Sequence, residues 1–133
     1  MHRFRLVHAT DLIELTVAGA LDVERSRALL LQLADENTEA GLDLLLDLRP
    51  AHDAGLTFRD VYGLVEVLGE HPDAFPGKVA LLDTDRPSFE KVQFFQASAT
   101  ERGFQVRAFL DFEAAVRWLH QTSPLDARRA GGS

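Results

Sequence analysis

Apolar and polar residues alternate at the start of the chain as they do in β-strands. Residues 4–7 and 12–18 are rich in apolar side chains, and the second run predicts a half-buried strand. Its apolar positions are Ile13, Leu15 and Val17, which alternate with Leu12, Glu14 and Thr16. Residues 9–11 lie between the two runs and predict a hairpin turn, and Gly19 is expected to end the second strand.

Two helices are predicted from start signals that are followed by apolar residues at helical spacing. Asp22 is a residue type that caps helix N-termini, and the pattern after it predicts a helix to about Asn37. Thr57 and Asp60 resemble a capping box, which predicts a second helix to about Leu68. The predicted core-facing residues are Val23, Ser26, Leu30, Leu33 and Ala34 in the first helix, and Phe58, Val61, Val65 and Leu68 in the second.

Three further strands are predicted in the rest of the chain. Residues 42–48 are almost continuously apolar, which is typical of a central strand covered on both faces. Residues 50–55 are expected to form a loop. Residues 78–82 and 105–110 predict the remaining two strands, and both are short enough to cross a buried sheet once.

Two more helices follow these strands. The third helix is expected after Pro87, a preferred first-turn residue, and is expected to end at Gly103. The fourth helix is expected to be capped by Asp111. The predicted core-facing residues are Phe89, Val92, Phe95 and Ala99 in the third helix, and Phe112, Ala115, Val116 and Leu119 in the fourth.

The resulting element order predicts an α/β fold. Strands that alternate with helices need crossover connections, so we expect a mostly parallel mixed sheet of about five strands, an N-terminal β-hairpin and four helices. Residues 1–122 are expected to form one domain. Residues 123–133 lack periodicity, contain Pro124 and end in Gly-Gly-Ser, so we expect a flexible C-terminal tail.

Composition narrows the classes of function. The 133 residues contain no cysteine, which excludes disulfides, a thiolate nucleophile and cysteine-ligated zinc. The formal net charge of −7 argues against nucleic acid and anionic membranes as partners. The N-terminus lacks the apolar run of a signal peptide, and the apolar stretches are too short for stable membrane insertion. A cytoplasmic location is therefore expected.

Three stretches resemble the SpoIIAA-like branch of the STAS family. Residues 17–22 (VAGALD) resemble the entry from a strand into the first helix, and residues 44–49 (LLLDLR) resemble the central strand. Residues 107–119 (RAFLDFEAAVRWL) resemble the closing strand and helix. The resemblance covers about residues 4–120 and implies a SpoIIAA-like fold with a regulatory, protein-binding function. SpoIIAA-like proteins also resemble the CRAL-TRIO lipid carriers in fold.

The resemblance also implies where a regulatory switch would lie. Anti-sigma-factor antagonists of the STAS family carry an Asp-Ser-Ser/Thr-Gly signature after the central strand, and its first serine is phosphorylated. The matching segment is Asp53-Ala54-Gly55-Leu56, in which one residue is missing and Ala54 occupies the acceptor position. Alanine has no hydroxyl group, so the usual phosphorylatable serine is absent, and Thr57 is only a distant substitute.

Polar residues follow the predicted parallel strands, where open α/β sheets usually bind ligands. These residues are Asp47, Arg49, His52 and Asp53 after the central strand, Asp83, Asp85 and Arg86 after the next, and Asp111 after the last. With Thr57 in place of Asp111, they form the candidate ligand- or partner-binding set. In the alternative interpretation, Asp85 and Asp111 only cap helices, while Arg49 and Arg86 neutralise carboxylates.

Catalytic and metal-binding interpretations have less support. The acidic residues are of a type that binds Mg²⁺, but Leu110-Asp111 stands where receiver-like phosphotransfer sites carry a lysine. His52 beside Asp53 has acid–base potential, but no nucleophile is near in sequence. The other histidines lack the spacing of zinc ligands, and the common nucleophile and phosphate-binding motifs are absent. No catalytic residue, metal or cofactor is therefore predicted.

Three hypotheses follow. The first is a regulatory module that binds another protein through residues 49–57 and the second helix. A homodimer through helix faces is part of it, because Phe94 and Trp118 lie off the core-facing stripes. The second is a carrier of a lipophilic ligand, which requires a pocket of roughly 300 Å³ or more. The third is a hydrolase or phosphotransfer enzyme that uses Asp47 or His52.

Overall fold

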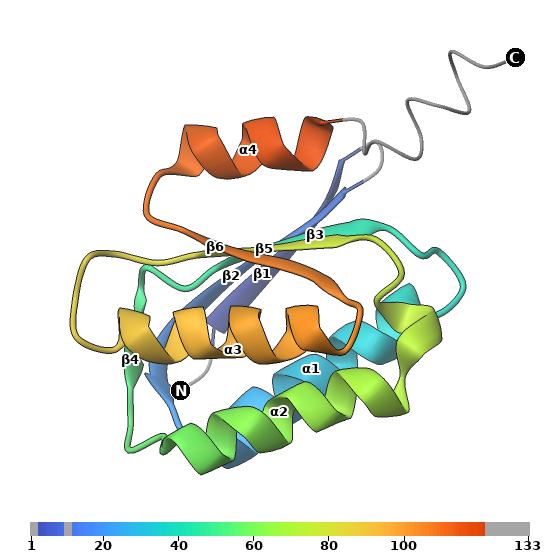
Figure 1. The fold of residues 1–133 in the computed structure, drawn as a ribbon. Helices are drawn as coiled ribbons and strands as arrows, with labels where there is room; N and C mark the ends of the chain where they lie inside the picture. The colour runs from blue at the N-terminus through green and yellow to red at the C-terminus, as the bar shows by residue number, and fades with distance from the viewer. Residues whose placement is uncertain (1–2, 10–11, 122–133) are drawn as a thin grey trace, which may run out of the picture.

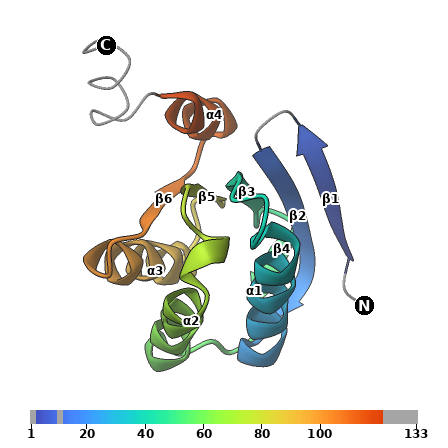
Figure 2. The same cartoon turned by 90° about the vertical axis from the view of Figure 1, so that its right-hand side faces the viewer.

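The computed structural model describes residues 3–9, as backbone, and residues 12–121. The elements in chain order are β1 (Arg3–Ala9), β2 (Leu12–Leu21), α1 (Val23–Asn37), β3 (Asp43–Asp47), β4 (Ala51–Asp53), α2 (Phe58–Glu70), the 3₁₀ helix η1 (Pro72–Ala74), β5 (Lys78–Leu82), α3 (Phe89–Glu101), β6 (Gln105–Phe109) and α4 (Phe112–His120). Helices α1, α2 and α3 lie on one side of the sheet, and α4 lies on the other (Figures 1 and 2). The predicted hairpin turn and the predicted C-terminal tail lie outside the described residues.

The sheet is mixed and mostly parallel, as predicted. Its order is β1-β2-β3-β5-β6, and the short strand β4 pairs with β2 beside this path. Strands β2, β3, β5 and β6 run parallel to one another, and β1 pairs antiparallel with β2. The carboxyl ends of four strands therefore meet at one edge of the sheet, which we call the carboxyl edge.

One part of the predicted loop is a strand. Strand β2 does not end at Gly19 but continues to Leu21, and Gly19 has a φ of 85° within it. The last residues of β2 extend beyond β3, and they pair with β4 in the register Gly19↔Ala51 and Leu21↔Asp53. The prediction that residues 50–55 form only a loop was wrong, because the backbone groups at the end of β2 needed partners.

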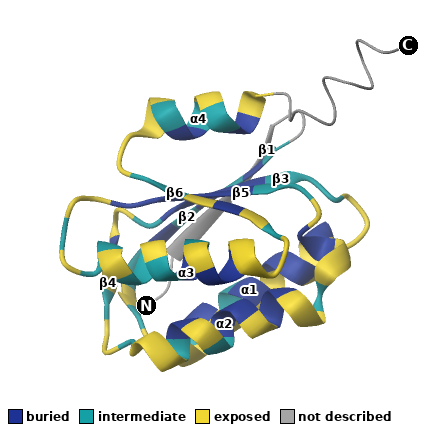
Figure 3. Cartoon of the chain, in the orientation of Figure 1, coloured by how far each residue is buried: buried dark blue, intermediate teal, exposed yellow. Residues whose placement is uncertain are grey.

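The core lies on both faces of the sheet. The alternation in β2 is confirmed, since Ile13, Leu15 and Val17 are at most 1% exposed. Within β3, Leu44 and Leu46 pack in the large cluster under α1, α2 and α3, whereas Leu45 packs in the smaller cluster under α4. Strand β3 is therefore covered on both faces, as its continuous apolar sequence predicts. Figure 3 shows the buried faces of the helices turned towards the sheet.

Three helix caps were predicted correctly, but the residues after them were not. Asp22 accepts a hydrogen bond from the Arg25 N–H at 2.8 Å, and Asp111 and Thr57 cap α4 and α2 in the same way. The expectation that Val23, Phe58 and Phe112 face the core was wrong, since they are 37%, 47% and 38% exposed. Each is the first residue of its helix, where the side chain leans back over the preceding turn and misses the core.

Candidate functional site

The last residue of β3, Asp47, is buried and holds Arg49 in a forked ion pair. The Arg49 Nε donates to Asp47 Oδ1 at 2.9 Å, and Arg49 Nη2 donates to Asp47 Oδ2 at 2.8 Å. The backbone N–H of Arg49 donates to the same carboxylate at 3.1 Å. The guanidinium also lies 5.9 Å from the ring centroid of Phe112 in α4. This contact ties the carboxyl edge to the single helix on the opposite face of the sheet.

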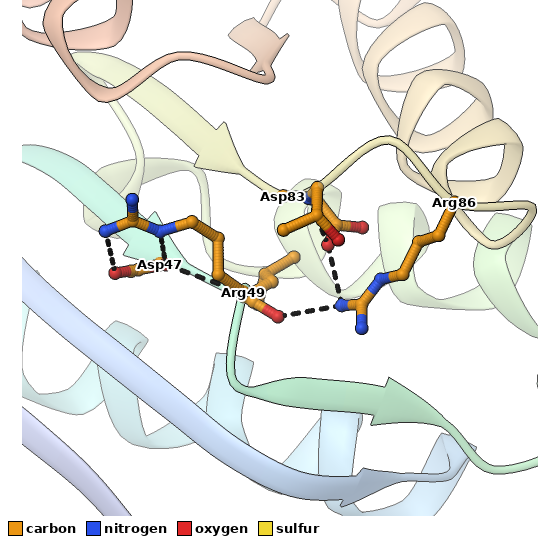
Figure 4. A network of polar contacts seen from close by, with 6 residues as sticks. Asp47, Arg49, Asp83 and Arg86 are labelled. Atoms are coloured by element: carbon orange, nitrogen blue, oxygen red, sulfur yellow. Dashed lines mark hydrogen bonds and ion pairs between the residues drawn. The ribbon is translucent and has the colours of Figure 1, made fainter.

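A second ion pair lies within the segment that follows β5, and its arginine also bonds to the segment that follows β3. Asp83 is 2% exposed, and its Oδ1 accepts a hydrogen bond from Arg86 Nη2 at 2.6 Å. The same Arg86 nitrogen donates to the Leu48 carbonyl at 3.0 Å. Figure 4 shows the two ion pairs at the carboxyl edge, with each arginine bonded to its own aspartate. Arg49 and Arg86 therefore pair with neighbouring carboxylates, as the alternative interpretation predicted.

A third ion pair was not predicted from the sequence. Asp53, at the end of β4, pairs with the ammonium group of Lys91 in the first turn of α3. The other Asp53 oxygen accepts a hydrogen bond from the Leu56 N–H at 2.8 Å. Lys91 lies 38 residues away in sequence, and its position in the first turn of a helix that begins near the carboxyl edge was the only available signal.

Asp47 and Asp53 are carboxylates at neutral pH. Burial opposes ionisation of Asp47, but hydrogen bonds and the charge of Arg49 outweigh it and lower the pKa. Burial likewise opposes ionisation of Asp53, and the bonds from Lys91 and from the Leu56 and Gly55 N–H groups lower its pKa. Groups that stay ionised in the neutral range accept hydrogen bonds but cannot act there as general acids.

The remaining candidate residues have separate roles. Thr57 is the N-cap of α2, and its side chain accepts from the Asp60 N–H at 3.0 Å. His52 is exposed on β4, and no hydrogen bond joins it to Asp53. Asp85 is exposed and does not cap α3, so that expectation was wrong. The first N–H groups of α3 already bond to backbone carbonyls of residues 86–88, which leaves a carboxylate cap nothing to accept.

A pocket lies between the helices and the sheet at the carboxyl edge. Its volume is about 120 Å³, and its inner wall is mainly aliphatic and aromatic. Leu46 and Leu81 come from the strands, Leu30 from α1, Leu64 from α2 and Phe95 from α3. The pocket is smaller than the roughly 300 Å³ that a carrier of a lipophilic ligand was expected to need.

The outer face of α2 presents two aromatic side chains one helical turn apart. Phe58 is 47% exposed and Tyr62 is 46% exposed. Phe58 packs edge-to-face against Phe94 of α3 at a centroid distance of 5.3 Å, and the Arg102 guanidinium lies 5.1 Å from the Tyr62 ring centroid. We call Phe58 and Tyr62 the aromatic pair. Trp118, by contrast, is half-buried and packs against the core under α4.

The described residues form neither a metal centre nor a membrane-spanning helix. Within the described part of the chain, no group of three or more histidine or acidic side chains is arranged to hold a metal ion. Asp47 and Asp83 are instead bonded to arginines. None of the helices in these segments is both long enough and apolar enough to cross a bilayer.

Comparison with known proteins identifies the fold. No family model matches the sequence, and no curated protein matches it. An anti-sigma factor antagonist from Mycobacterium paratuberculosis matches in structure with a TM-score of 0.60 at 10% identity, over 91% of this chain and 96% of that one. A protein with a SpoIIAA-like fold from Shewanella loihica PV-4 matches with a TM-score of 0.59 at 16% identity, over 90% and 95%.

The anti-sigma factor antagonist SpoIIAA in its unphosphorylated form matches with a TM-score of 0.50 at 20% identity, over 90% of this chain and all of that one. SpoIIAA of Bacillus in its phosphorylated form is similar at 19% identity. Each of these matches covers between 87% and 91% of this chain. The chain therefore has the SpoIIAA-like fold that its three sequence stretches predict.

Proposed function

We propose that this chain is a non-catalytic regulatory module that binds another protein through residues 49–57 and the outer face of α2. The observation that carries the proposal is the aromatic pair. Phe58 and Tyr62 are each almost half exposed, and they begin where the segment with the candidate residues ends. Exposed apolar patches can mark protein-binding surfaces, and aromatic residues are enriched at such interfaces.

The aromatic pair has the chemistry of a binding hot spot. Tyrosine, tryptophan and arginine dominate the free energy of protein association. Here Phe94 supports one ring and Arg102 lies against the other, so both rings are held in place before a partner arrives. The partner that fits this surface offers apolar side chains for the two rings and a polar rim for the surrounding charges.

The carboxyl edge supports a binding role over catalysis. Its carboxylates at Asp47, Asp53 and Asp83 are bonded to Arg49, Lys91 and Arg86, which leaves none of the three without a cation. The sequence resemblance implies that Ala54 takes the position of the phosphorylated serine in the signature of anti-sigma-factor antagonists. We therefore propose that binding here is not switched by phosphorylation at this position.

The proposal is tested with tagged protein and an extract of the source organism. Proteins retained by the wild type are identified, and the affinity of the purified partner is then measured by calorimetry. We expect Phe58→Ser/Tyr62→Ser to weaken binding at least about ten-fold, because two hot-spot side chains are truncated. Leu31→Ser is the matched control, since Leu31 is 42% exposed on α1 and lies outside the proposed surface.

Two results would contradict the proposal. Equal affinity for the wild type and the double variant would remove the aromatic pair from the interface. Analytical ultracentrifugation of the chain alone tests the predicted homodimer in the same experiment. A dimer that dissociates only in Phe58→Ser/Tyr62→Ser would mean that a second copy of this chain, and not a different protein, occupies the surface.

A further inference from the structure

The outer face of α2 continues past the aromatic pair with two carboxylates. Glu66 and Glu70 follow Tyr62 at intervals of four residues, so their side chains lie on the same side of the helix as the aromatic pair. Both glutamates are exposed, and Figure 3 shows exposed positions at both ends of α2. The face that the proposed partner would contact is therefore apolar in its first half and acidic in its second half.

The two glutamates do not stabilise α2. Like charges four residues apart on a helix repel each other, and Glu66 and Glu70 have this spacing. Glu70 is also the last residue of α2, where the end of the helix carries partial negative charge, and the last turn contains no basic residue. The stability of the helix therefore gives no reason for this pair of charges.

The two glutamates also lack ion pairs within the part of the chain that the structure describes. The ion pairs there are formed by Asp47, Asp53 and Asp83. The guanidinium of Arg102 lies 5.1 Å from the ring centroid of Tyr62, but it forms no ion pair with either glutamate. Two exposed charges of the same sign, next to the aromatic pair, are therefore free to meet cations of a partner.

We propose that the protein partner is a basic amphipathic helix, with cationic side chains for Glu66 and Glu70 and apolar side chains for the aromatic pair. A helix repeats its side chains at the same four-residue spacing, so two such faces match turn by turn. Opposite charges across an interface steer association and fix the register. The net charge of −7 favours a basic partner over a second copy of this chain. This inference rests on the proposed function and adds the charge and shape of the partner to it.

Two synthetic helical peptides serve as matched probes. Each has about 16 residues of alanine and glutamine, with two leucines at four-residue spacing on one face. Two lysines continue this face in the first peptide, and two glutamates replace them in the second. Both are made in either sequence order, so that parallel and antiparallel docking are covered. NMR titration through the backbone amides of α2 gives the affinities. We expect the lysine peptide, in one order, to bind at least about five-fold more tightly at low salt, and this preference to shrink in about 1 M salt.

Two double variants separate a local charge contact from the net charge of the chain. Glu66→Gln/Glu70→Gln should remove the preference for the lysine peptide. Asp35→Asn/Glu36→Gln is the matched control, because it removes two negative charges from exposed positions of α1, and it should keep the preference. Glu66→Gln/Glu70→Gln should also raise the melting temperature by about 3 °C, because it removes the repulsion and the charge at the helix end. Weaker binding together with higher stability distinguishes a binding role from a structural one.

Three results would overturn the proposal. An equal loss of preference in the two double variants would show that only the net charge acts. If the lysine peptide binds in neither order, a basic helix does not fit this face. An unchanged or lower melting temperature for Glu66→Gln/Glu70→Gln would show that the chain itself uses the two charges.

A third variant separates this proposal from the proposed function. Phe58→Ser/Tyr62→Ser should weaken both peptides alike and leave the preference for lysine in place. If this variant binds both peptides like the wild type, the aromatic pair is not part of the surface and the proposed function fails. If instead only Glu66→Gln/Glu70→Gln behaves like the wild type, the aromatic surface remains and only the charge of the partner is wrong.

Discussion

Buried or half-buried polar side chains lie at both ends of the central strands, but their hydrogen-bond partners differ. At the amino end, Asn37 and Asp43 bond to the backbone of neighbouring segments. At the carboxyl edge, Asp47, Asp53 and Asp83 bond mainly to charged side chains. A backbone group cannot move away without unfolding its segment, whereas an arginine or lysine side chain can rotate towards a new partner.

At the amino end, both polar atoms of the Asn37 side chain have hydrogen-bond partners in the backbone. Asn37 is 0% exposed, and its Nδ2 donates to the carbonyls of Leu42 at 3.0 Å and Ala74 at 2.7 Å. Its Oδ1 accepts from the Leu42 N–H at 2.9 Å. One side chain thus joins the end of α1, the start of β3 and the η1 turn, and because it is 0% exposed neither water nor a ligand reaches it.

At the carboxyl edge, some polar groups can still take a new hydrogen-bond partner. The side chains of Arg49 and Arg86 are 44% and 28% exposed, so solvent reaches both ion pairs. Arg86 Nε has no hydrogen-bond acceptor in the part of the chain that the structure describes, and Arg86 is one of the residues that line the pocket. Buried polar residues alone therefore do not distinguish the two ends of the sheet. We propose that a binding site is marked instead by polar groups whose present partners are side chains that can exchange.

The largest expected effect is at the amino end. Asn37→Ala removes three hydrogen bonds and leaves two carbonyls and one N–H buried without partners, so we expect a loss of about 3 kcal/mol in the free energy of unfolding. Urea denaturation measures it. Glu36→Ala, at an exposed position of the same helix turn, should change stability by less than about 0.5 kcal/mol. Similar losses of unfolding free energy for the two variants would mean that the hydrogen bonds of Asn37 do not hold the amino end of the sheet together.

A smaller loss of stability is expected from a substitution at Gly77, which lies close to Asp43 at the same end of the sheet. A Cβ atom on Gly77 would lie 2.3 Å from Asp43 Oδ1, which accepts the Lys78 N–H at 2.8 Å. Gly77→Ala should therefore displace the carboxylate and cost about 2 kcal/mol in thermal or urea unfolding.

A double-mutant cycle isolates the cause of that cost. In an Asp43→Ala background the carboxylate is absent, so Gly77→Ala should cost less than half as much. An equal cost in both backgrounds would mean that the strain lies in the backbone and not in the contact with Asp43.

The smallest effect, at the carboxyl edge, should depend on pH. Because the pKa of Asp47 is lowered in the folded chain, the pair with Arg49 stabilises the fold above about pH 4 and loses this contribution as the pH falls further. Arg49 is 44% exposed, so the contribution should be at most about 1 kcal/mol. The difference in unfolding free energy between the wild type and Asp47→Asn should shrink between pH 7 and pH 2.5.

The cost of Asn37→Ala should stay constant over the same pH range, because no titrating group takes part. A difference for Asp47→Asn that persists at pH 2.5 would show that its contacts are as fixed as those of Asn37. In that case the proposed distinction between the two ends of the sheet would be wrong.

Local signals in the sequence predicted most of the fold. Helix starts at Asp22, Thr57 and Asp111 depend on side chains that bond within three residues, so their chemistry is visible in a short window. The alternation in β2 and the continuous apolar run of β3 also reflect local geometry. These elements and their order were sufficient to predict the mixed sheet with four helices.

Contacts between distant residues were not predictable in the same way. Asn37 meets Ala74 and Lys91 meets Asp53, at separations of 37 and 38 residues, and no local pattern connects them. The pairing of β4 with β2 depends on how far β2 extends past β3, which is a property of the assembled sheet. The polar residues of the carboxyl edge were therefore predicted as a group, and so was the neutralisation of carboxylates by Arg49 and Arg86, but the pair of Asp53 with Lys91 was not.

Strand β4 has a further consequence for recognition. The Ala54 N–H donates to the Leu21 carbonyl at 2.9 Å, and the Gly19 N–H donates to the Pro50 carbonyl at 3.2 Å, so both ends of the segment are fastened to β2. Ordering a mobile loop is one of the main entropic costs of association. A segment that is already held in place avoids the entropic cost of ordering. Contacts that its side chains make with a partner would therefore contribute directly to affinity, because the segment is preorganised.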